Sequence, residues 1–229
     1  MRSFLCGRTF LVVTLAVAAV VSQAGPFEAT ARADSPAPAS APSPPPALDL
    51  ARFASGHVLK SNAVPLGKTD RYGRAELLVA APIDAVRHEV TSYNGYRELA
   101  PDKFNRSRII AKENGETDVY MQVPVLGGVV VLWQVMRFAP VVGVGSAVER
   151  LEGRYVRGNL KNASVLYTLT AVDARRTVLR MDLLVLPNMA VPQSVLDEEL
   201  RDAAGTAAEA MRDRAEHRTR ANPAEVAKF

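Results

Sequence analysis

The sequence predicts an α+β fold in which an antiparallel sheet packs against a long C-terminal helix. Several segments between residues 116 and 186 alternate apolar and polar residues, which is typical of half-buried antiparallel strands. A single short helical pattern, APIDAVRHEVTSYNGYRELAP at residues 81–101, interrupts the strands. The last periodic segment begins at Pro192 and carries an apolar stripe at helical spacing.

The elements before the alternating segments are short. Residues 48–56 favour a short helix, and we expect strands at residues 57–64 and 74–80, on either side of the turn-forming sequence LGKTDRYG. In the interrupting segment, Pro82 and Asp84 suit the first turn of a helix, because proline tolerates that position and a carboxylate complements the helix dipole. Asn94 and Gly95 end this helix, and one further turn fits before Pro101.

The segments after this helix predict five or six antiparallel strands. The strands that the pattern places are residues 116–123, 129–138, 148–158, 162–172 and 177–186. Residues 129–138 are apolar on both faces apart from Gln134 and Arg137, so this strand is either covered on both sides or meets a partner with its outer face. A long helix then runs from Pro192, and we expect residues 218–229 to form a disordered tail.

The N-terminus has the pattern of a signal peptide. Arg2 and Arg8 precede an apolar run at residues 11–21, which is shorter than the roughly 20 residues that a membrane-spanning helix needs. Small residues allow cleavage after Ala24 or after Ala33, and we favour Ala33, which makes residues 1–33 the signal peptide. An uncleaved N-terminal anchor is the alternative. We therefore expect a protein that is exported to the periplasm or the extracellular space.

Composition limits what the exported chain can do. Residues 34–47 are rich in proline, alanine and serine and predict a disordered linker, leaving residues 48–217 as one domain. Cleavage removes Cys6, the only cysteine of the sequence, and with it any disulfide or sulfur ligand. The formal charge of +4 falls to +2 when three arginines and one glutamate leave with the signal peptide. This small excess of positive charge does not indicate a nucleic-acid partner.

The order of the elements resembles that of the START-like superfamily, whose helix-grip fold wraps a curved sheet around the C-terminal helix. The resemblance is to its polyketide cyclase and coenzyme Q-binding branch and spans residues 56–214. The positions that match are Ala81 and Pro82 at the helix entry, Val86 within the helix, and Thr91, Tyr93, Tyr96 and Pro101 in the turn after it. Arg87 and Ser92 depart from it, since an aromatic residue and an aspartate are usual there. The resemblance implies that the short helices cap the open end of the sheet, where family members admit their ligand.

A sheet curved over a helix has an interior that its inward side chains line. The residues predicted to line it and to bind a ligand are Met121, Val123, Gln134, Tyr155, Arg157, Val165, Tyr167, Leu169, Leu179, Met181, Leu183, Leu200, Ala204, Ala207 and Met211. Such a lining suits an apolar guest, and the resemblance implies a lipid, quinone, sterol or polyketide. The alternative stays open that these residues pack shut as an ordinary core, because every antiparallel domain needs one apolar face.

The polar residues of this lining have separate expected roles. Tyr155 and Tyr167 carry hydroxyls that need partners if they are buried, and a buried Gln134 must also be hydrogen-bonded. Arg157 shares the alternation of Leu151 and Tyr155 and is predicted to point inward toward a polar head group, unless a bulge near Gly153 reverses it.

The sequence predicts no catalytic residues, no metal site and no cofactor. His57, His88 and His217 are widely separated and lack the spacing of zinc ligands, and neither a nucleophile elbow nor a phosphate-binding loop occurs. His88, beside Glu89, is more simply a solvated helix residue than a general base.

Three functions follow from these features. The first is an exported START-like domain that binds, and carries, a hydrophobic small molecule or lipid. The second is a cyclase or aromatase that uses the same interior, with Tyr155, Tyr167, Arg157 or His88 moving protons. The third is an interaction module in which the strand at residues 129–138 makes a transient contact with a membrane or pairs with a protein, assisted by a basic segment near the C-terminus.

Overall fold

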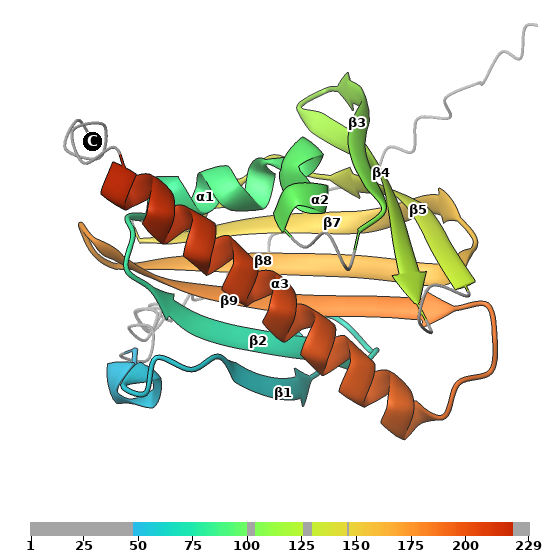
Figure 1. Cartoon of the computed structure of the whole chain (residues 1–229), viewed down its shortest axis with the longest axis horizontal. Coiled ribbons are helices and arrows are strands. Elements are labelled where there is room, and N and C mark those ends of the chain that lie inside the picture. Colours follow the sequence, from blue (N-terminus) through green and yellow to red (C-terminus); the bar gives the residue numbers. More distant parts are fainter. Residues whose placement is uncertain (1–47, 100–103, 126–129, 146, 222–229) are drawn as a thin grey trace, which may run out of the picture. The chain divides into compact units, whose positions relative to one another are not determined.

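An antiparallel sheet of nine strands forms the body of the structure, a computed structural model that describes residues 48–99, 104–125, 130–145 and 147–221 (Figure 1). The strand order is β1-β2-β9-β8-β7-β5-β4-β3, and the short β6 pairs with β7. The strands are β1 (Leu59–Ala63), β2 (Tyr72–Val79), β3 (Arg106–Glu113), β4 (Glu116–Val125), β5 (Val130–Phe138), β6 (Val142–Gly143), β7 (Val148–Gly158), β8 (Leu160–Asp173) and β9 (Arg176–Pro187). The predicted signal peptide and linker lie outside the described residues.

The helices α1 (Ile83–Thr91), α2 (Tyr96–Leu99) and α3 (Gln193–Ala221), with the 3-10 turn η2 (Tyr93–Gly95), cover one face of this sheet. A further 3-10 turn, η1 (Leu50–Phe53), precedes β1, and its Arg52 bonds Glu76 of β2. In Figure 1, α3 runs obliquely across the sheet and its C-terminal end lies beside α1. It packs chiefly against β1, β2 and β9. Among the described helices, none has both the length and the apolar character that crossing a bilayer requires.

The predicted alternation is confirmed where it was clearest. Val165, Tyr167 and Leu169 on β8 are buried and face the helices, whereas the intervening Leu166 and Thr168 are only half-buried. The inward residues of β2, β4, β5, β8 and β9 join the inner face of α3 in one apolar core. The predicted helix-grip arrangement, with a large sheet around a long C-terminal helix, is therefore present.

Small residues bring α3 very close to the sheet. A Cβ atom added at Gly73 on β2 would lie 2.2 Å from the carbonyl carbon and oxygen of Leu200, so only glycine fits beneath the helix at this point. Further along α3, Ala204, Ala208 and Ala215 have no exposed surface. The alanine-rich stripe thus serves close packing between the helix and the sheet at these positions.

Two boundaries differ from the sequence prediction. The tail predicted from residue 218 is wrong for residues 218–221, because α3 continues to Ala221. Arg218 bonds Glu89 of α1, and the Thr219 hydroxyl donates to the carbonyl of Ala215 at 2.9 Å, which fixes this last part of the helix. The edge strand β3 was not predicted, because it is mostly exposed and a register shift between Ile109 and Ala111 breaks its alternation.

Candidate functional site

Most of the predicted ligand-binding residues lie together on the face of the sheet that α3 covers. Nine are fully buried in the interior: Met121, Val165, Tyr167, Leu169, Leu179, Met181, Leu200, Ala204 and Met211. Five are half-buried: Val123, Gln134, Tyr155, Leu183 and Ala207. Thirteen of these fourteen side chains are apolar or aromatic, Gln134 being the exception, so the interior is chemically suited to apolar contacts.

Burial decreases from one end of this interior to the other. At the α1 end, Leu169 and Leu179 have at most 2 % of their surface exposed. At the opposite end, where β9 leads toward the start of α3, a set of half-buried residues faces the same side; we call it the half-buried wall. It comprises Val123 of β4, Leu132 and Gln134 of β5, Tyr155 of β7, and Leu183 and Val185 of β9. Because α3 packs chiefly against β1, β2 and β9, the part of the wall on β4, β5 and β7 lies to the side of the helix.

The α1 end is filled by aromatic rings. Tyr93 stacks on Phe138 with ring centroids 4.4 Å apart and meets Tyr96 edge-on at 5.9 Å. The Tyr96 hydroxyl donates to the carbonyl of Val90 at 2.7 Å, and Tyr167 contacts Tyr96 from β8. The short helices therefore cap this end of the sheet, as the resemblance implied, and their rings close it in this conformation.

Burial controls the ionisation of these tyrosines. Removal from water disfavours the charged phenolate and raises the pKa of Tyr167 to about 12. The same cause raises the pKa values of Tyr93 and Tyr96 above the ordinary range, and the neighbouring Tyr167 adds to the effect on both. These hydroxyls are neutral at physiological pH, and that of Tyr96 is held by its hydrogen bond to Val90.

Gln134 is the one amide in the half-buried wall. It lies opposite Met121 of β4 and Gly158 of β7, and its side-chain oxygen Oε1 is buried without a hydrogen-bond partner among the described residues. An unsatisfied buried carbonyl of this kind costs free energy, so a hydrogen-bond donor from a guest molecule or from water would stabilise this position.

The other polar residues predicted for the interior do not form a catalytic group. Tyr155 donates its hydroxyl to the carbonyl of Leu160 at 3.1 Å, so this group is already paired within the protein. The inward orientation predicted for Arg157 is wrong. The β5–β7 register places Val135 opposite Arg157 and Met136 opposite Tyr155, so Val156 is an extra residue and turns Arg157 to the exposed outer face. His88 is also exposed.

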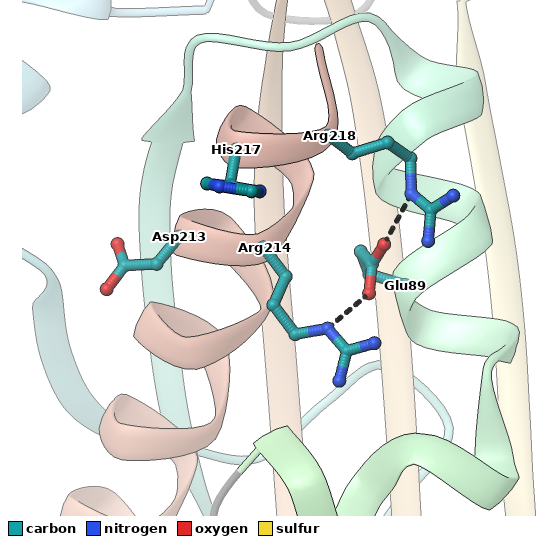
Figure 2. A pocket seen from close by; sticks show the side chains of 5 residues that line it. All are labelled: Glu89, Asp213, Arg214, His217 and Arg218. Carbon is teal, nitrogen blue, oxygen red and sulfur yellow. Dashed lines mark hydrogen bonds and ion pairs between the residues drawn. The ribbon is translucent and has the colours of Figure 1, made fainter. Parts of the chain in front are cut away.

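A charged pocket of about 430 Å³ lies between α1 and the C-terminal part of α3 (Figure 2). At its centre, the Glu89 carboxylate is buried and accepts a hydrogen bond from Nε of Arg218 at 2.9 Å. Nε of Arg214 lies 3.1 Å from its other oxygen, in ion-pair contact. Asp213 and His217 complete the lining. Because Glu89 comes from α1 and both arginines from α3, this cluster ties the two helices together.

The sequence alone did not reveal this cluster. Glu89 occupies a buried position of α1 next to Val90, and a carboxylate on the buried side of a helix indicates a hidden cationic partner. Its partner Arg218 is 129 positions away along the chain, and no local sequence pattern connects two residues so far apart. Arg87, which departs from the usual aromatic residue, bonds Glu149 with two nitrogens, the Nε contact being 2.7 Å.

A second pocket, of about 270 Å³, lies where the loop between β1 and β2 meets β7 and β8. Lys68 of this loop bonds Glu152 of β7 at 2.6 Å, which raises the pKa of Lys68. The β7–β8 ladder ends at Arg154 and Ser164, at the edge of the pocket. Within the described ranges, no group of three or more histidine, cysteine, aspartate and glutamate side chains is arranged to hold a metal ion.

Comparisons with known proteins agree with the geometry of the fold. No protein-family model matches the sequence, and no curated protein matches it either. Among solved structures, the chain is similar to the Zhui aromatase/cyclase from Streptomyces sp. R1128, with 22 % identity, 66 % of this chain and 96 % of that chain covered, and a TM-score of 0.52.

Two lipid-transfer proteins have the same fold. A STAR-related lipid transfer protein from Xanthomonas axonopodis is 17 % identical, with 68 % of this chain and 98 % of that chain covered and a TM-score of 0.56. Human StAR-related lipid transfer protein 5 is 12 % identical, with 73 % and 89 % covered and a TM-score of 0.57. The chain thus has the START-like helix-grip fold, and at these identities the similarity establishes the fold alone.

Proposed function

We propose that this chain is an exported START-like domain that binds, and carries, a hydrophobic small molecule or lipid between its sheet and α3. The half-buried wall is the observation that supports this most strongly. It continues the buried apolar interior toward the end of the sheet where α3 begins, and it leaves apolar side chains only partly covered. The proteins of similar fold include lipid-transfer proteins, which favours the same class of ligand.

The energetics of this wall favour an elongated apolar guest. Each 100 Å² of apolar surface removed from water contributes about 2.5 kcal/mol, before the cost of immobilising the ligand. Val123, Leu183 and Val185 offer aliphatic contacts on β4 and β9, and the unpaired Gln134 oxygen lies between these strands, on β5 next to β4. A guest with an aliphatic body and one hydrogen-bond donor would satisfy both features.

Export is part of the proposal and rests on the N-terminal sequence. The basic start, the short apolar run and the small residues before Gly25 and Asp34 are those of a cleaved signal peptide. The protein would then act in the periplasm or outside the cell. N-terminal sequencing of the protein recovered from its native compartment tests this: a terminus at residue 25 or 34 supports export with cleavage, and an intact Met1 contradicts it.

Mass spectrometry of organic extracts tests the ligand. The protein recovered from its native compartment should yield one class of apolar molecule in near-stoichiometric amount. Val185→Trp fills the wall and should abolish this recovery, whereas Val142→Trp, at an exposed position of β6, should leave it unchanged. Extracts without any apolar molecule, together with failure to bind apolar probes, would contradict the proposal.

A cyclase or aromatase activity is the second candidate. The similarity in fold to an aromatase/cyclase and the presence of the Tyr155 and Tyr167 hydroxyls on the inner face favour it. The two other proton carriers that it would use, His88 and Arg157, lie on exposed surfaces away from that face. Turnover that requires the Tyr155 or Tyr167 hydroxyl, lost in Tyr155→Phe or Tyr167→Phe, would support this function over carriage alone.

A further inference from the structure

The outer face of the sheet, opposite α3, presents an ordered set of basic and aromatic side chains on β3, β4, β5 and β7. The strand register defines two neighbouring rows across it. One row is Arg106, Gln122 and Trp133, and the next is Arg108, Tyr120, Val135 and Arg157. All of these point away from the interior, because their neighbours Val119, Met121 and Met136 belong to the buried core.

Positive charge is concentrated in these two rows. Arg106, Arg108 and Arg157 are exposed. In the part of the chain that the structure describes, none of the three forms a salt bridge. Both rows lack a carboxylate, so no acidic side chain within them pairs with these three positive charges.

The adjoining row shows the contrast. In that row, Asp118 of β4 lies opposite Ala111 of β3 on one side and Arg137 of β5 on the other. Arg137 in turn lies opposite Arg154 of β7. Arg137 bonds Asp118 at 2.6 Å, and Arg154 pairs with Glu116 at 2.9 Å. The Arg137 hydrogen bond is the main cause that lowers the pKa of Asp118, and the charges of Arg154 and Arg157 add to it. Ion pairing therefore neutralises this row, and the charge of the two rows beside it stays available.

Apolar and aromatic groups accompany the three arginines. Trp133 lies 6.3 Å from Tyr120 between ring centroids, and both are half-buried. Val131 is 39 % exposed one row further along β5, and Val156 is 41 % exposed at the β7 bulge. Proteins that meet the headgroup region of a bilayer often combine tryptophan and tyrosine with exposed aliphatic residues and arginines, as this surface does.

We propose that this surface, formed by Arg106, Arg108, Arg157, Tyr120, Trp133 and Val131 and called here the arginine–aromatic patch, docks the domain on a membrane that contains anionic lipids. The arginines contact lipid phosphates, and Trp133 and Val131 enter the headgroup region. This goes beyond ligand binding, because the patch lies on the face of the sheet opposite the interior.

The geometry of Tyr120 favours a lipid surface over single-stranded nucleic acid. Stacking of bases needs a free aromatic face. The guanidinium of Arg108 already lies 5.5 Å from the centroid of the Tyr120 ring, and Gln122 donates to the Tyr120 hydroxyl at 2.7 Å. The ring is thus engaged within the protein, and the exposed valines offer apolar contacts that a polyanion does not use.

Trp133 supplies a direct probe, because it is the only tryptophan of the chain. The protein is mixed with vesicles of phosphatidylcholine containing phosphatidylserine, or of phosphatidylcholine alone, and the emission of Trp133 is followed. With the anionic vesicles only, we expect the emission of Trp133 to shift to the blue and to be quenched by lipids that carry a spin label near the headgroup. Added salt should reverse both changes. Binding to vesicles without any change at Trp133 would place the contact elsewhere and overturn the proposal.

Charge variants complete the test. Each arginine near an anionic surface contributes about fivefold to partitioning, so Arg106→Gln, Arg108→Gln and Arg157→Gln together should weaken vesicle binding by about 100-fold. The matched control is Arg150→Gln, Arg175→Gln and Arg220→Gln, which removes the same charge from other exposed positions and should retain binding. Equal losses in both sets would overturn the proposal. The proposal would also be overturned if the emission of Trp133 changed with single-stranded DNA or an acidic peptide but not with anionic vesicles.

Discussion

Removal of the two arginines beside Glu89 should destabilise the protein more than removal of Glu89 itself. The reason is an asymmetry of burial: the side chain of Glu89 is 1 % exposed, whereas those of Arg214 and Arg218 are 34 % and 41 % exposed. In Arg214→Met with Arg218→Met, a carboxylate stays buried without a counter-charge. Loss of one partner from a buried ion pair costs about 3–5 kcal/mol.

The opposite change leaves charges that water can reach. In Glu89→Gln, both guanidinium groups stay partly hydrated, and the amide still accepts one hydrogen bond, so the expected loss is about 1–2 kcal/mol. The variant with all three changes replaces the charged cluster by neutral groups and should be more stable than the double arginine variant by about 2 kcal/mol. Methionine keeps the apolar stem of arginine, which limits losses from packing.

Urea unfolding monitored by the fluorescence of Trp133 measures these differences. The free energies of unfolding are compared between variants that share the same m value, the slope of this free energy against urea concentration. An equal m value shows that the variants expose the same amount of surface on unfolding. Equal losses in the glutamate variant and the double arginine variant would refute the argument. So would a triple variant whose loss equals the sum of the other two, because additivity means that the residues do not interact.

Three further predictions concern the packing of α3, the buried tyrosines and the half-buried wall. Gly73→Ala forces a Cβ atom against the α3 backbone and should cost about 3 kcal/mol in urea unfolding, whereas Gly143→Ala, whose nearest atom lies at 3.9 Å, should cost little. Burial raises the pKa of Tyr167 to about 12, above its ordinary value of 10.0. The neutral hydroxyl therefore contributes stability that is fully present below pH 10 and is lost as the pH rises through the pKa of the folded protein. An ultraviolet titration in which every tyrosine of the folded protein ionises near pH 10 would contradict this. Gln134→Met removes a buried carbonyl without a partner, so the free energy of unfolding should stay equal or rise by up to about 1 kcal/mol. The same change should weaken the binding of ligands that carry a hydroxyl. If the preference between hydroxylated and plain alkyl probes does not change, Gln134 does not face the ligand.

The alternation of the sequence was enough to predict the main strands and the terminal helix. On β8 from Ala163 to Leu169 and on β9 from Leu179 to Val185, the inward positions follow the period of two, because both strands lie in the middle of the sheet and only one of their faces meets α3. The edge strand β3 escaped prediction, since a strand with exposed residues on both faces carries little apolar signal.

The candidate site could be predicted only in part. Fourteen of the fifteen predicted lining residues are buried or half-buried, and Arg157 fails because one extra residue on β7 reverses the alternation. A bulge depends on pairing with the neighbouring strand, which the sequence of β7 does not contain. The rows of the arginine–aromatic patch are set by the register of four strands in the same way, and the Glu89 cluster joins residues 129 positions apart.

Photo-crosslinking with an alkyl probe that carries a diazirine tests the ligand site most directly, because it reports where an apolar molecule lies. We expect adducts on the inner face, at residues such as Val123 and Leu183 of the half-buried wall, and their loss when excess unlabelled lipid competes. Adducts confined to exposed apolar residues such as Leu66, or none above background, would contradict an apolar ligand between the sheet and α3.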